Sequence, residues 1–442
     1  MSGCPFFNPT GADSFERSDR SRTSLNQQKR TPTMGEEEST MTFEDTGSAS
    51  ILGFVTTESD FLTLKNEPTH YSSYLGIDVL TQLQDGVASC KPGGRGLIHH
   101  EELTFIITHQ VFELWFKLMI EDLRISRECL KNISLLDLTN TPRIMQKAIR
   151  YINRAEAIFH HSVGAFGILE TMHPSEFLEF RDYLVPASGF QSVAFRTLEQ
   201  ILGVPNATRC LVNDASVFSY LREEEQQVLE REALEPSLSS LVLDLFASVA
   251  VPPDFVEVYL RTTRRVQEEQ QYGIARARRG EAKSERLVDA AVASMASLLM
   301  DPAAWTDGVV LPDDEAREKF TRAVRGALFV LSYRSEDNCV HAAALLDALV
   351  ALEEGMLLWR GRHAHMAERM IGRRGGTGGT TSGVEYLDVT RRYRIFHALW
   401  LVRKMLIRPS ALPPLSSYNN GMWSKGIDVG TAEKQSETDD KE

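Results

Sequence analysis

The stretch from Glu101 to Leu130 limits the fold more than any other part of the sequence, because it contains neither proline nor glycine. Proline breaks the interior of a helix and glycine weakens it, so this run predicts one long helix. An opening Thr-Pro pair, or a composition rich in Glu, Arg, Ala and Leu, predicts further helices. These begin at Thr141 and cover about 221–234, 267–299 and 339–372. Alternating runs closed by tight turns are scarce, so we expect an all-α fold.

Both ends of the chain differ in composition from its middle. Residues 1–48 are rich in Ser, Thr, Glu, Gln and Arg and poor in aromatic side chains, which predicts a disordered arm. Residues 409–442 run from Pro, Ser, Asn and Gly into the sequence SETDDKE, which predicts a second disordered tail. Residues 49–408 are therefore expected to form one large helical domain.

Charge and hydropathy exclude several classes of partner. The chain has 442 residues, with 61 acidic against 48 basic side chains and a net charge of −13. This balance disfavours binding to nucleic acid, which needs a basic face. Apolar runs such as Ser240–Val251 contain Asp244 and stop at two prolines, too short and too charged to span a membrane. The polar first 30 residues hold no secretory signal, so we predict a cytoplasmic protein.

Common catalytic and metal-binding motifs are incomplete in this sequence. The five cysteines are scattered without a Cys-x-x-Cys pair, which favours reduced thiols over a disulfide framework or a zinc knuckle. His100-Glu101 begins a zinc-protease motif, but Thr104 stands at the second histidine position. Ser188 lacks the GxSxG elbow. The glycine-rich segment 375–379 lacks the Lys of a phosphate loop, so it is either a connector or a loop that approaches a ligand closely.

His109 is predicted to lie on an aromatic face of the first long helix. Phe105, Phe112 and Phe116 stand four residues before it, and three and seven residues after it, which places them on the same side. One interpretation is a core histidine bonded to a backbone carbonyl, and the other is a functional group in a pocket.

His363 is predicted to lie on an apolar face of the last long helix. The side chains at helical spacing from it are apolar: Met356, Trp359, Met366, Ala367 and Met370. His365 is rotated by roughly 200° and shares its side with charged residues, so one ion cannot bind both histidines from a regular helix. A neutral imidazole in apolar surroundings suits a planar macrocycle with one axial histidine, although spacing alone leaves a packing role open.

Four segments, in the same order, resemble the tryptophan 2,3-dioxygenase family. They are YSSYLGIDVLTQLQ (71–84), ELTFIITHQVFELWFK (102–117), ETMHPSEFLEFRDYLVPASGFQSVAFRTLE (170–199) and WRGRHAHMAERMIGRRGGTGGTTSGVEYL (359–387). The similarity covers roughly 71–202 and 326–408, whereas 204–325 matches only in helical character. The resemblance implies an all-helical homotetramer that binds b-type haem. It also implies oxidation of L-tryptophan by dioxygen to N-formylkynurenine, the first step of the kynurenine pathway.

The resemblance also implies roles for individual residues. His363 falls on the proximal iron ligand and His109 on the distal side, with Phe105 lining the indole pocket. Arg181 in Phe-Arg-Asp-Tyr-Leu falls on the arginine that holds the substrate carboxylate, a pairing that suits a planar guanidinium. Thr377 falls near the substrate ammonium. The remaining pocket positions are Tyr71 and Ser188, with Tyr74 and Leu75 on a segment lent by a neighbouring subunit.

Two departures from the family pattern concern the substrate side. The loop after Gly379 is one residue longer than the usual form, and Phe177 replaces a tyrosine of some bacterial members. Three other functions compete with the dioxygenase: a haem sensor or carrier, a helical scaffold without a cofactor, and a dioxygenase of broader indole specificity. Retention of both Arg181 and Thr377 argues against a sensor, which needs no amino-acid clamp. A lack of absorption near 400 nm after haem is supplied would indicate the scaffold. Activity on D-tryptophan or tryptamine would indicate the dioxygenase of broader specificity.

Overall fold

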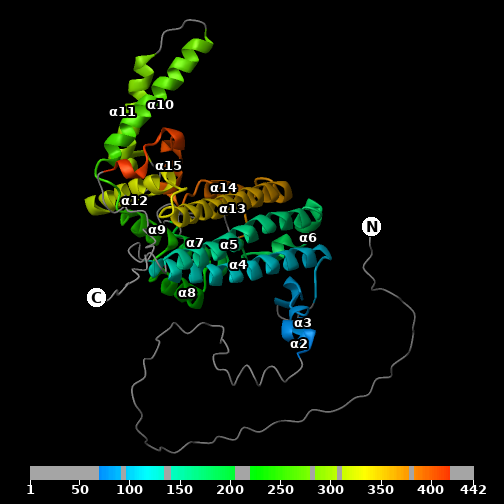
Figure 1. Ribbon diagram of the computed structural model, residues 1–442. Coiled ribbons are helices and arrows are strands. Elements are labelled where there is room, and N and C mark those ends of the chain that lie inside the picture. Colours follow the sequence, from blue (N-terminus) through cyan, green and yellow to red (C-terminus); the bar gives the residue numbers. More distant parts are fainter. Residues whose placement is uncertain are drawn as a thin grey trace, which may run out of the picture. The chain divides into compact units, whose positions relative to one another are not determined.

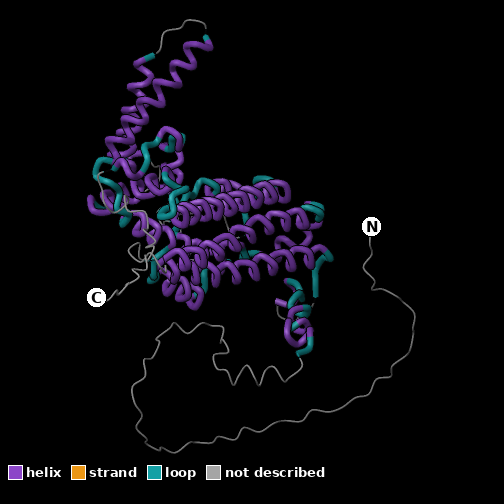
Figure 2. The backbone as a smooth tube through the Cα atoms, viewed as in Figure 1, coloured by secondary structure: helices purple, strands orange, loops and turns teal. Residues whose placement is uncertain are grey.

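Helices account for all the regular structure that can be described in this protein (Figures 1 and 2). The structure is a computed structural model and describes residues 69–90, 96–133, 141–204, 220–278, 284–305, 311–377 and 383–418. The chain divides into two units after Tyr74. Within the first unit, residues 69–74 are described, and they include the start of the short helix α2. The all-α prediction is confirmed.

The helices follow one another along the chain in this order. They are α2 (Tyr71–Leu75), α3 (Ile77–Leu80), η1 (Val87–Cys90), α4 (Glu101–Lys131), α5 (Thr141–Leu169), α6 (Pro174–Leu184), η2 (Gly189–Gln191), α7 (Val193–Leu202), α8 (Glu223–Ala233), α9 (Leu238–Ala247), α10 (Phe255–Ala277), α11 (Glu285–Met300), η5 (Pro302–Trp305), α12 (Asp314–Ser332), α13 (Val340–Ile371), α14 (Gly383–Thr390), α15 (His397–Met405), η6 (Pro409–Ala411) and η7 (Leu415–Ser417).

Helices α4, α5 and α13 form the layer that positions the main cavity. Helix α5 packs against both α4 and α13, and the three lie side by side in Figure 1. Helix α4 begins with two glutamates and ends with Lys131, which complements the helix dipole at both ends. Helix α13 ends at Ile371, and the positive φ of 60° at the following Gly372 stops the helix. Both helices have close to the predicted extents.

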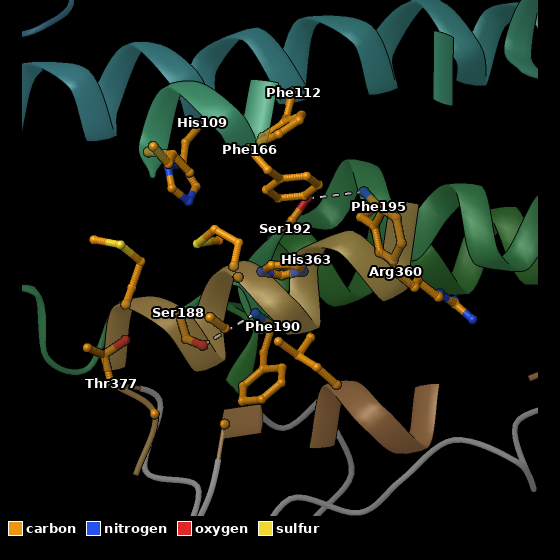
Figure 3. A pocket seen from close by; sticks show the side chains of 18 of the residues that line it. His109, Phe112, Phe166, Ser188, Phe190, Ser192, Phe195, Arg360, His363 and Thr377 are labelled. Carbon is orange, nitrogen blue, oxygen red and sulfur yellow. Dashed lines mark hydrogen bonds between the residues drawn. The ribbon is translucent and has the colours of Figure 1, made fainter. Parts of the chain in front are cut away.

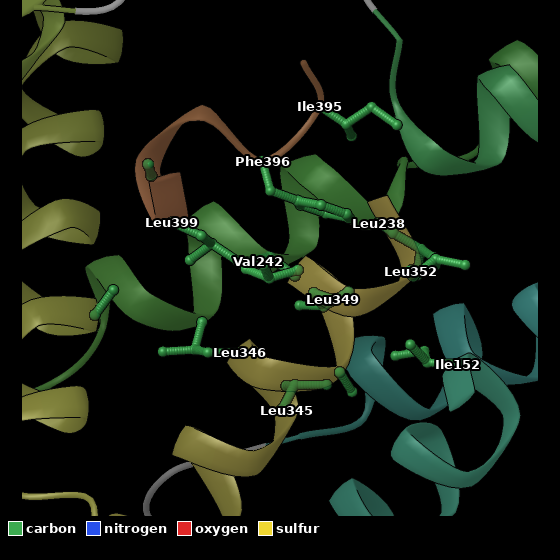
Figure 4. Close-up of a cluster of buried hydrophobic side chains, with 14 of the residues drawn as sticks. Ile152, Leu238, Val242, Leu345, Leu346, Leu349, Leu352, Ile395, Phe396 and Leu399 are labelled. Carbon is green, nitrogen blue, oxygen red and sulfur yellow. The ribbon is translucent and has the colours of Figure 1, made fainter. Parts of the chain in front are cut away.

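Helix α12 packs closely on α9 at Gly326. A Cβ atom at this position would overlap the carbonyl oxygen of Phe246, so only glycine permits the observed approach. Figure 4 shows the neighbouring core, where Leu238 and Val242 of α9 lie beside Leu349 of α13. Helix α9 therefore connects α12 with α4 of the cavity layer.

Helices α10 and α11 form a hairpin that buries most of its core side chains near its base, with Val288 of α11 buried farther out. The buried residues of α10 are Phe255, Tyr259, Thr262 and Thr263, all in its first half. The helical stretch expected over 267–299 is two helices, because α10 ends at Ala277 and α11 starts at Glu285. Gly280, a poor helix former, lies in the sequence between them.

The C-terminal boundary predicted at residue 408 is wrong by at least ten residues. Ala411, Leu415 and Tyr418 are buried, and the Tyr333 hydroxyl donates a hydrogen bond of 2.9 Å to the Pro413 carbonyl. Polar composition hid this segment, because three well-spaced apolar side chains suffice to dock it. The arm predicted over 1–48 and the rest of the predicted tail lie outside the described residues.

Helix α4 is long and apolar enough, by length and composition, to cross a membrane. A core helix passes the same test. Helix α4 buries Phe112, Phe116 and Leu123 in the main hydrophobic cluster, and it also buries the charged side chains of Asp122 and Arg127. These contacts are those of a helix packed against other helices.

Candidate active site

A cavity of about 270 Å³ opens between α4, α5, α6, α13 and α14. Its walls are mostly apolar and aromatic, with a few polar side chains at separate points. Figure 3 shows His109 and His363 on opposite sides of this space, supplied by α4 and α13. The two histidines, predicted from separate helix faces, are thus brought into one site.

The ring of His109 is fixed by a local hydrogen bond. Its Nδ1 lies 2.7 Å from the carbonyl oxygen of Phe105, and this oxygen only accepts, so Nδ1 carries the proton. Burial lowers the pKa of His109, and the bond to Phe105 offsets this only in part. The neutral ring therefore has a lone pair on Nε2. The ring also contacts Phe105, with 4.1 Å between centroids.

His363 is a neutral base among aromatic rings. Its imidazole stacks on Phe166 with 5.4 Å between centroids, and Trp359 lies 5.3 Å away. Burial, together with the nearby His109, lowers the pKa of His363 to about 4. His365, two residues later, is exposed, as the helical-face argument predicts. An imidazole in this state can ligate a metal without first losing a proton.

The aromatic residues predicted beside the two histidines meet in one wall together with Phe166 and Phe195, which were not predicted. Phe112, Phe116, Phe166 and Phe195 each approach Trp359, with ring centroids 5.1–5.8 Å apart. The buried Nε1 of Trp359 has no hydrogen-bond partner among the described residues. A wall of this kind suits a flat, apolar group better than a charged small molecule.

Arg181 and Thr377 place polar groups on the lining of the same cavity. Arg181, on α6, donates to the Gly375 carbonyl and lies 3.4 Å from Asp182, whose own side chain is 83% exposed. Thr377 donates its hydroxyl proton to the Ala187 carbonyl at 2.7 Å, so its lone pairs stay available. The loop segment 378–382, with the extra residue, lies outside the described part of the chain.

Three further predicted lining residues also lie in the cavity. Phe105 and Phe177 stack with 5.6 Å between centroids, so an aromatic ring occupies the position at which some relatives are expected to have a hydroxyl. Ser188 lines the cavity and caps the short helix η2, where its side chain accepts from the Phe190 N–H at 3.5 Å.

Tyr71, Tyr74 and Leu75 are not among the lining residues, all of which fall between 105 and 390. Their side chains on α2 are 72%, 77% and 44% exposed. Tyr71 and Tyr74 belong to the first unit and Leu75 begins the second. Their predicted contribution to a neighbouring subunit stays a prediction.

A buried charged cluster was missed by the sequence analysis. Glu199 of α7 accepts from Arg360 at 2.6 Å and lies 2.8 Å from Arg196, and all three side chains are buried at the cavity. Arg360 also donates to the Thr390 carbonyl at 3.0 Å. The cluster joins α7, α13 and α14 near His363. Charged residues on otherwise apolar helix faces were the available signal.

The donor set favours a cofactor held by one side chain. Among the described residues, no group of three or more His, Cys, Asp or Glu side chains is arranged to bind a metal ion. The site instead offers His363, with its low pKa, facing an aromatic cavity. These residues fit a flat metal macrocycle with one axial imidazole.

Comparison with known proteins gives one family over most of the chain. Residues 58–406 match the family described as tryptophan 2,3-dioxygenase, including the region 204–325. The chain is 35% identical over 373 residues to tryptophan 2,3-dioxygenase 2 of Ralstonia nicotianae, which covers 79% of this chain and 96% of that protein. It is 34% identical to the enzymes of Sorangium cellulosum over 367 residues and Xenopus laevis over 357 residues. Each alignment covers 78% of this chain, with 85% and 84% of those proteins.

Proposed function

The chain belongs to the tryptophan 2,3-dioxygenase family, and from this premise we propose that it oxidises L-tryptophan with dioxygen to N-formylkynurenine. This reaction opens the indole ring between C2 and C3 and begins tryptophan degradation by the kynurenine pathway. The proposal rests on one observation above all. Two neutral histidines face each other across an aromatic cavity. The same cavity is lined by Arg181, whose guanidinium has further N–H donors besides the one bonded to the Gly375 carbonyl.

The proposed cofactor is b-type haem, held by His363. The low pKa keeps this imidazole neutral at physiological pH, as an axial ligand requires. Phe166 and Trp359 restrict the rotation of the ring from two sides. The haem supplies the activation of dioxygen when bound.

His109 is proposed to hold the indole. Because its Nδ1 proton is committed to the Phe105 carbonyl, the Nε2 lone pair is the group offered to the cavity. This lone pair accepts a hydrogen bond from the indole N–H and orients the ring. Phe105, in contact with His109 and Phe177, supplies an apolar surface for the indole.

Arg181 and Thr377 are proposed to bind the amino-acid end of the substrate. The Arg181 guanidinium exchanges the weak contact with Asp182 for a bidentate pair with the tryptophan carboxylate. The Thr377 hydroxyl donates to Ala187, so it accepts from the substrate ammonium. Ser188 adds a polar group on the same lining.

One spectroscopic experiment tests this function. We expect the purified protein, supplied with haem, to absorb near 400 nm and to change its spectrum when L-tryptophan is added under reducing conditions. Admission of oxygen should then yield N-formylkynurenine. Bound haem without turnover would favour the sensor or carrier, and no haem absorption would favour the scaffold. Rates on D-tryptophan or tryptamine equal to the rate on L-tryptophan would favour the dioxygenase of broader indole specificity.

The proposed assembly is a homotetramer with active sites shared between subunits. Helix α4 leaves an apolar stripe at helical spacing on its outer side, formed by Ile107, Val111, Leu114 and Leu118, with exposures of 45%, 37%, 52% and 37%. A contiguous apolar stripe of this kind favours burial against another chain. The exposed Tyr74 and Leu75 are proposed to reach a neighbour's indole pocket.

A mixing experiment tests the sharing of sites. An inactive Arg181→Ala chain and an inactive chain with Tyr74→Ala and Leu75→Ala are refolded together. Activity should return, because some sites pair an intact arginine with an intact partner segment. If mixed oligomers form and remain inactive, each chain builds its own site.

The proposed surroundings of the enzyme are the cytoplasm, with L-tryptophan and dioxygen as its small-molecule partners. The net charge of −13 supports the absence of a nucleic-acid partner. The charged side chains of Asp122 and Arg127, which α4 buries, support a protein that does not cross a membrane. Fractionation of cells followed by an activity assay tests this location.

A further inference from the structure

The first half of α5 carries a basic face on an otherwise acidic protein. Arg143, Lys147 and Arg150 follow one another at spacings of four and three residues, so they lie on one side of the helix, and all three are exposed. We call these three residues the basic stripe. No acidic residue occurs between Thr141 and Ala155, although the chain has a net charge of −13. Like charges gathered in this way attract an anionic partner.

The described residues around the basic stripe do not neutralise it. None of its three side chains forms an ion pair with a described residue. Arg154, the next basic residue on the same face, bonds instead to the buried carboxylate of Asp122 at 2.6 Å. Tyr151 orients Arg150, because its hydroxyl accepts from the guanidinium at 2.8 Å and its ring centroid lies 4.7 Å from the Arg150 Cζ.

Helices α5 and α13 run in the same direction (Figure 1). Phe159 of α5 lies beside Gly355 of α13, and farther along both helices Phe166 stacks on His363. Counting back equal lengths from these contacts places the start of α13 beside the first turn of α5. The basic stripe therefore lies at the end of the bundle where α13 begins.

Tyr418, the last described residue, is anchored at this same end. It is buried, and its hydroxyl lies 2.8 Å from the hydroxyl of Tyr333, the residue that ends α12 shortly before α13 starts. The chain that follows Tyr418 thus leaves the fold close to the basic stripe.

The sequence after Tyr418 contains an acidic segment of matching charge. Residues 436–442 read SETDDKE, with four acidic side chains and one lysine, and they lie outside the described part of the chain. About 18 residues separate Tyr418 from Glu437, which as a flexible linker span roughly 20–25 Å. The basic stripe is only about 10 Å long. The segment can therefore reach the stripe without strain.

We propose that the acidic segment 436–442 binds to the basic stripe of the same chain. Each exposed ion pair contributes little by itself, about 0.2–1 kcal/mol. Tethering compensates for this, because a short flexible linker gives the segment an effective concentration in the millimolar range. The contact is an intramolecular, salt-sensitive one, and it does not depend on the dioxygenase reaction.

Carbodiimide cross-linking of the full-length protein tests this contact, because the reagent joins an amine to a carboxylate only where the two meet. We expect an amide between Lys147 and Glu437, Asp439 or Asp440, identified by mass spectrometry. Lys131 and Glu235, 2.5 Å apart, provide the internal standard. Salt at about 0.5 M screens exposed charges and should lower the Lys147 product more than the standard, whose two ends the fold holds together.

Two variants separate the basic stripe from a general effect of charge. Arg143→Gln combined with Arg150→Gln keeps Lys147 and should lower its cross-link roughly 2- to 10-fold relative to the standard. Arg276→Gln combined with Arg286→Gln removes the same charge from exposed positions on the outer hairpin and should leave the cross-link unchanged. An equal loss in both variants would overturn the proposal.

Isotope labelling identifies the chain that supplies the acidic segment. Chains grown on ¹⁴N and ¹⁵N are refolded together, and we expect Lys147 products that carry a single isotope. Mixed products would assign the stripe to a second copy, and products with Glu36–Glu38 would assign it to the N-terminal arm. Either result would overturn the proposal, as would an intact Lys131–Glu235 standard without any Lys147 product.

Discussion

Helices α13 and α10 are both long, but they use their length differently. Helix α13 buries side chains from Ala342 to Met370 and carries His363 on the cavity side. Helix α10 buries none after Thr263, although α11 packs against it. The side chains of α13 are therefore constrained by their neighbours along the whole helix. Those in the outer half of α10 need only be compatible with helical structure.

This difference in burial explains why the family's sequence motifs are recognisable around the cavity and not in the outer hairpin. A position that lines the cavity must have one particular shape and charge, so His363 and its neighbours are recognisable in the sequence. An outer hairpin position accepts any good helix former. The family match nevertheless runs through 204–325, which shows that a fold can be retained where motifs are not visible.

The largest expected effect is the loss of haem from His363→Ala. No other histidine shares its cavity face on α13, so no replacement ligand is available there. We expect absorption near 400 nm to disappear after gel filtration with haem. His365→Ala, on the exposed side, should keep the full spectrum, and the reverse result would refute the helical-face argument.

Arg181→Ala compares a side chain that lines the cavity with the exposed Asp182 beside it. Losing a charge-assisted bidentate pair costs about 2–5 kcal/mol, which corresponds to a fall in kcat/KM for tryptophan of roughly 30- to 5,000-fold, with a strong rise in KM. Haem should stay bound, because its proposed ligand His363 lies on α13 and Arg181 lies on α6. The control is Asp182→Ala, whose 83% exposed side chain should be dispensable. An unchanged KM in Arg181→Ala would place the carboxylate elsewhere.

Two glycine substitutions compare the packed region with the hairpin directly. Gly326→Ala puts a Cβ against the Phe246 carbonyl and should lower the free energy of unfolding by about 1–3 kcal/mol. Gly273→Ala on α10 meets open space and should raise it by about 0.5–1 kcal/mol, because alanine favours helix. Denaturant titrations measure both. A stabilised Gly326→Ala would show that α9 and α12 separate easily.

The contributions of Glu353 and Glu269 to the free energy of unfolding should change with pH in opposite directions. Burial raises the pKa of Glu353, despite its hydrogen bonds from Ile395 and Trp400, so its contribution to stability is full below the unfolded value of about 4.5 and is lost as pH rises. Arg408 lowers the pKa of Glu269 on α10, so that contribution is present above the unfolded value and is lost as pH falls.

Gln substitutions at these two positions provide the smallest test. Glu353→Gln should flatten the decline of unfolding free energy as pH rises above about 4.5, and Glu269→Gln should slightly reduce the loss on acidification. Thermal melts between pH 4 and 8 give both profiles. Identical profiles for the two variants would contradict the distinction between a buried and an exposed carboxylate.

Helix periodicity was sufficient to predict the fold class, the extents of α4 and α13, and the faces that carry His109 and His363. These features are local, because each depends on residues within one helix. The cluster of Arg196, Glu199 and Arg360 was not predictable in this way, since its members come from helices about 160 residues apart. The docking of 409–418 depends likewise on distant partners such as Tyr333.

The position of α5 between α4 and α13 has a consequence for synthesis on the ribosome. About 170 residues separate the end of α5 from the start of α13. Synthesis proceeds at roughly 5–20 residues per second, so α13 follows α5 after a delay on the order of 10–30 s. Until α13 is made, Phe159, which ends in the core, lacks its ring contact with Trp359. The growing polypeptide therefore has an interval in which one face of α5 lacks the helix that covers it in the finished fold.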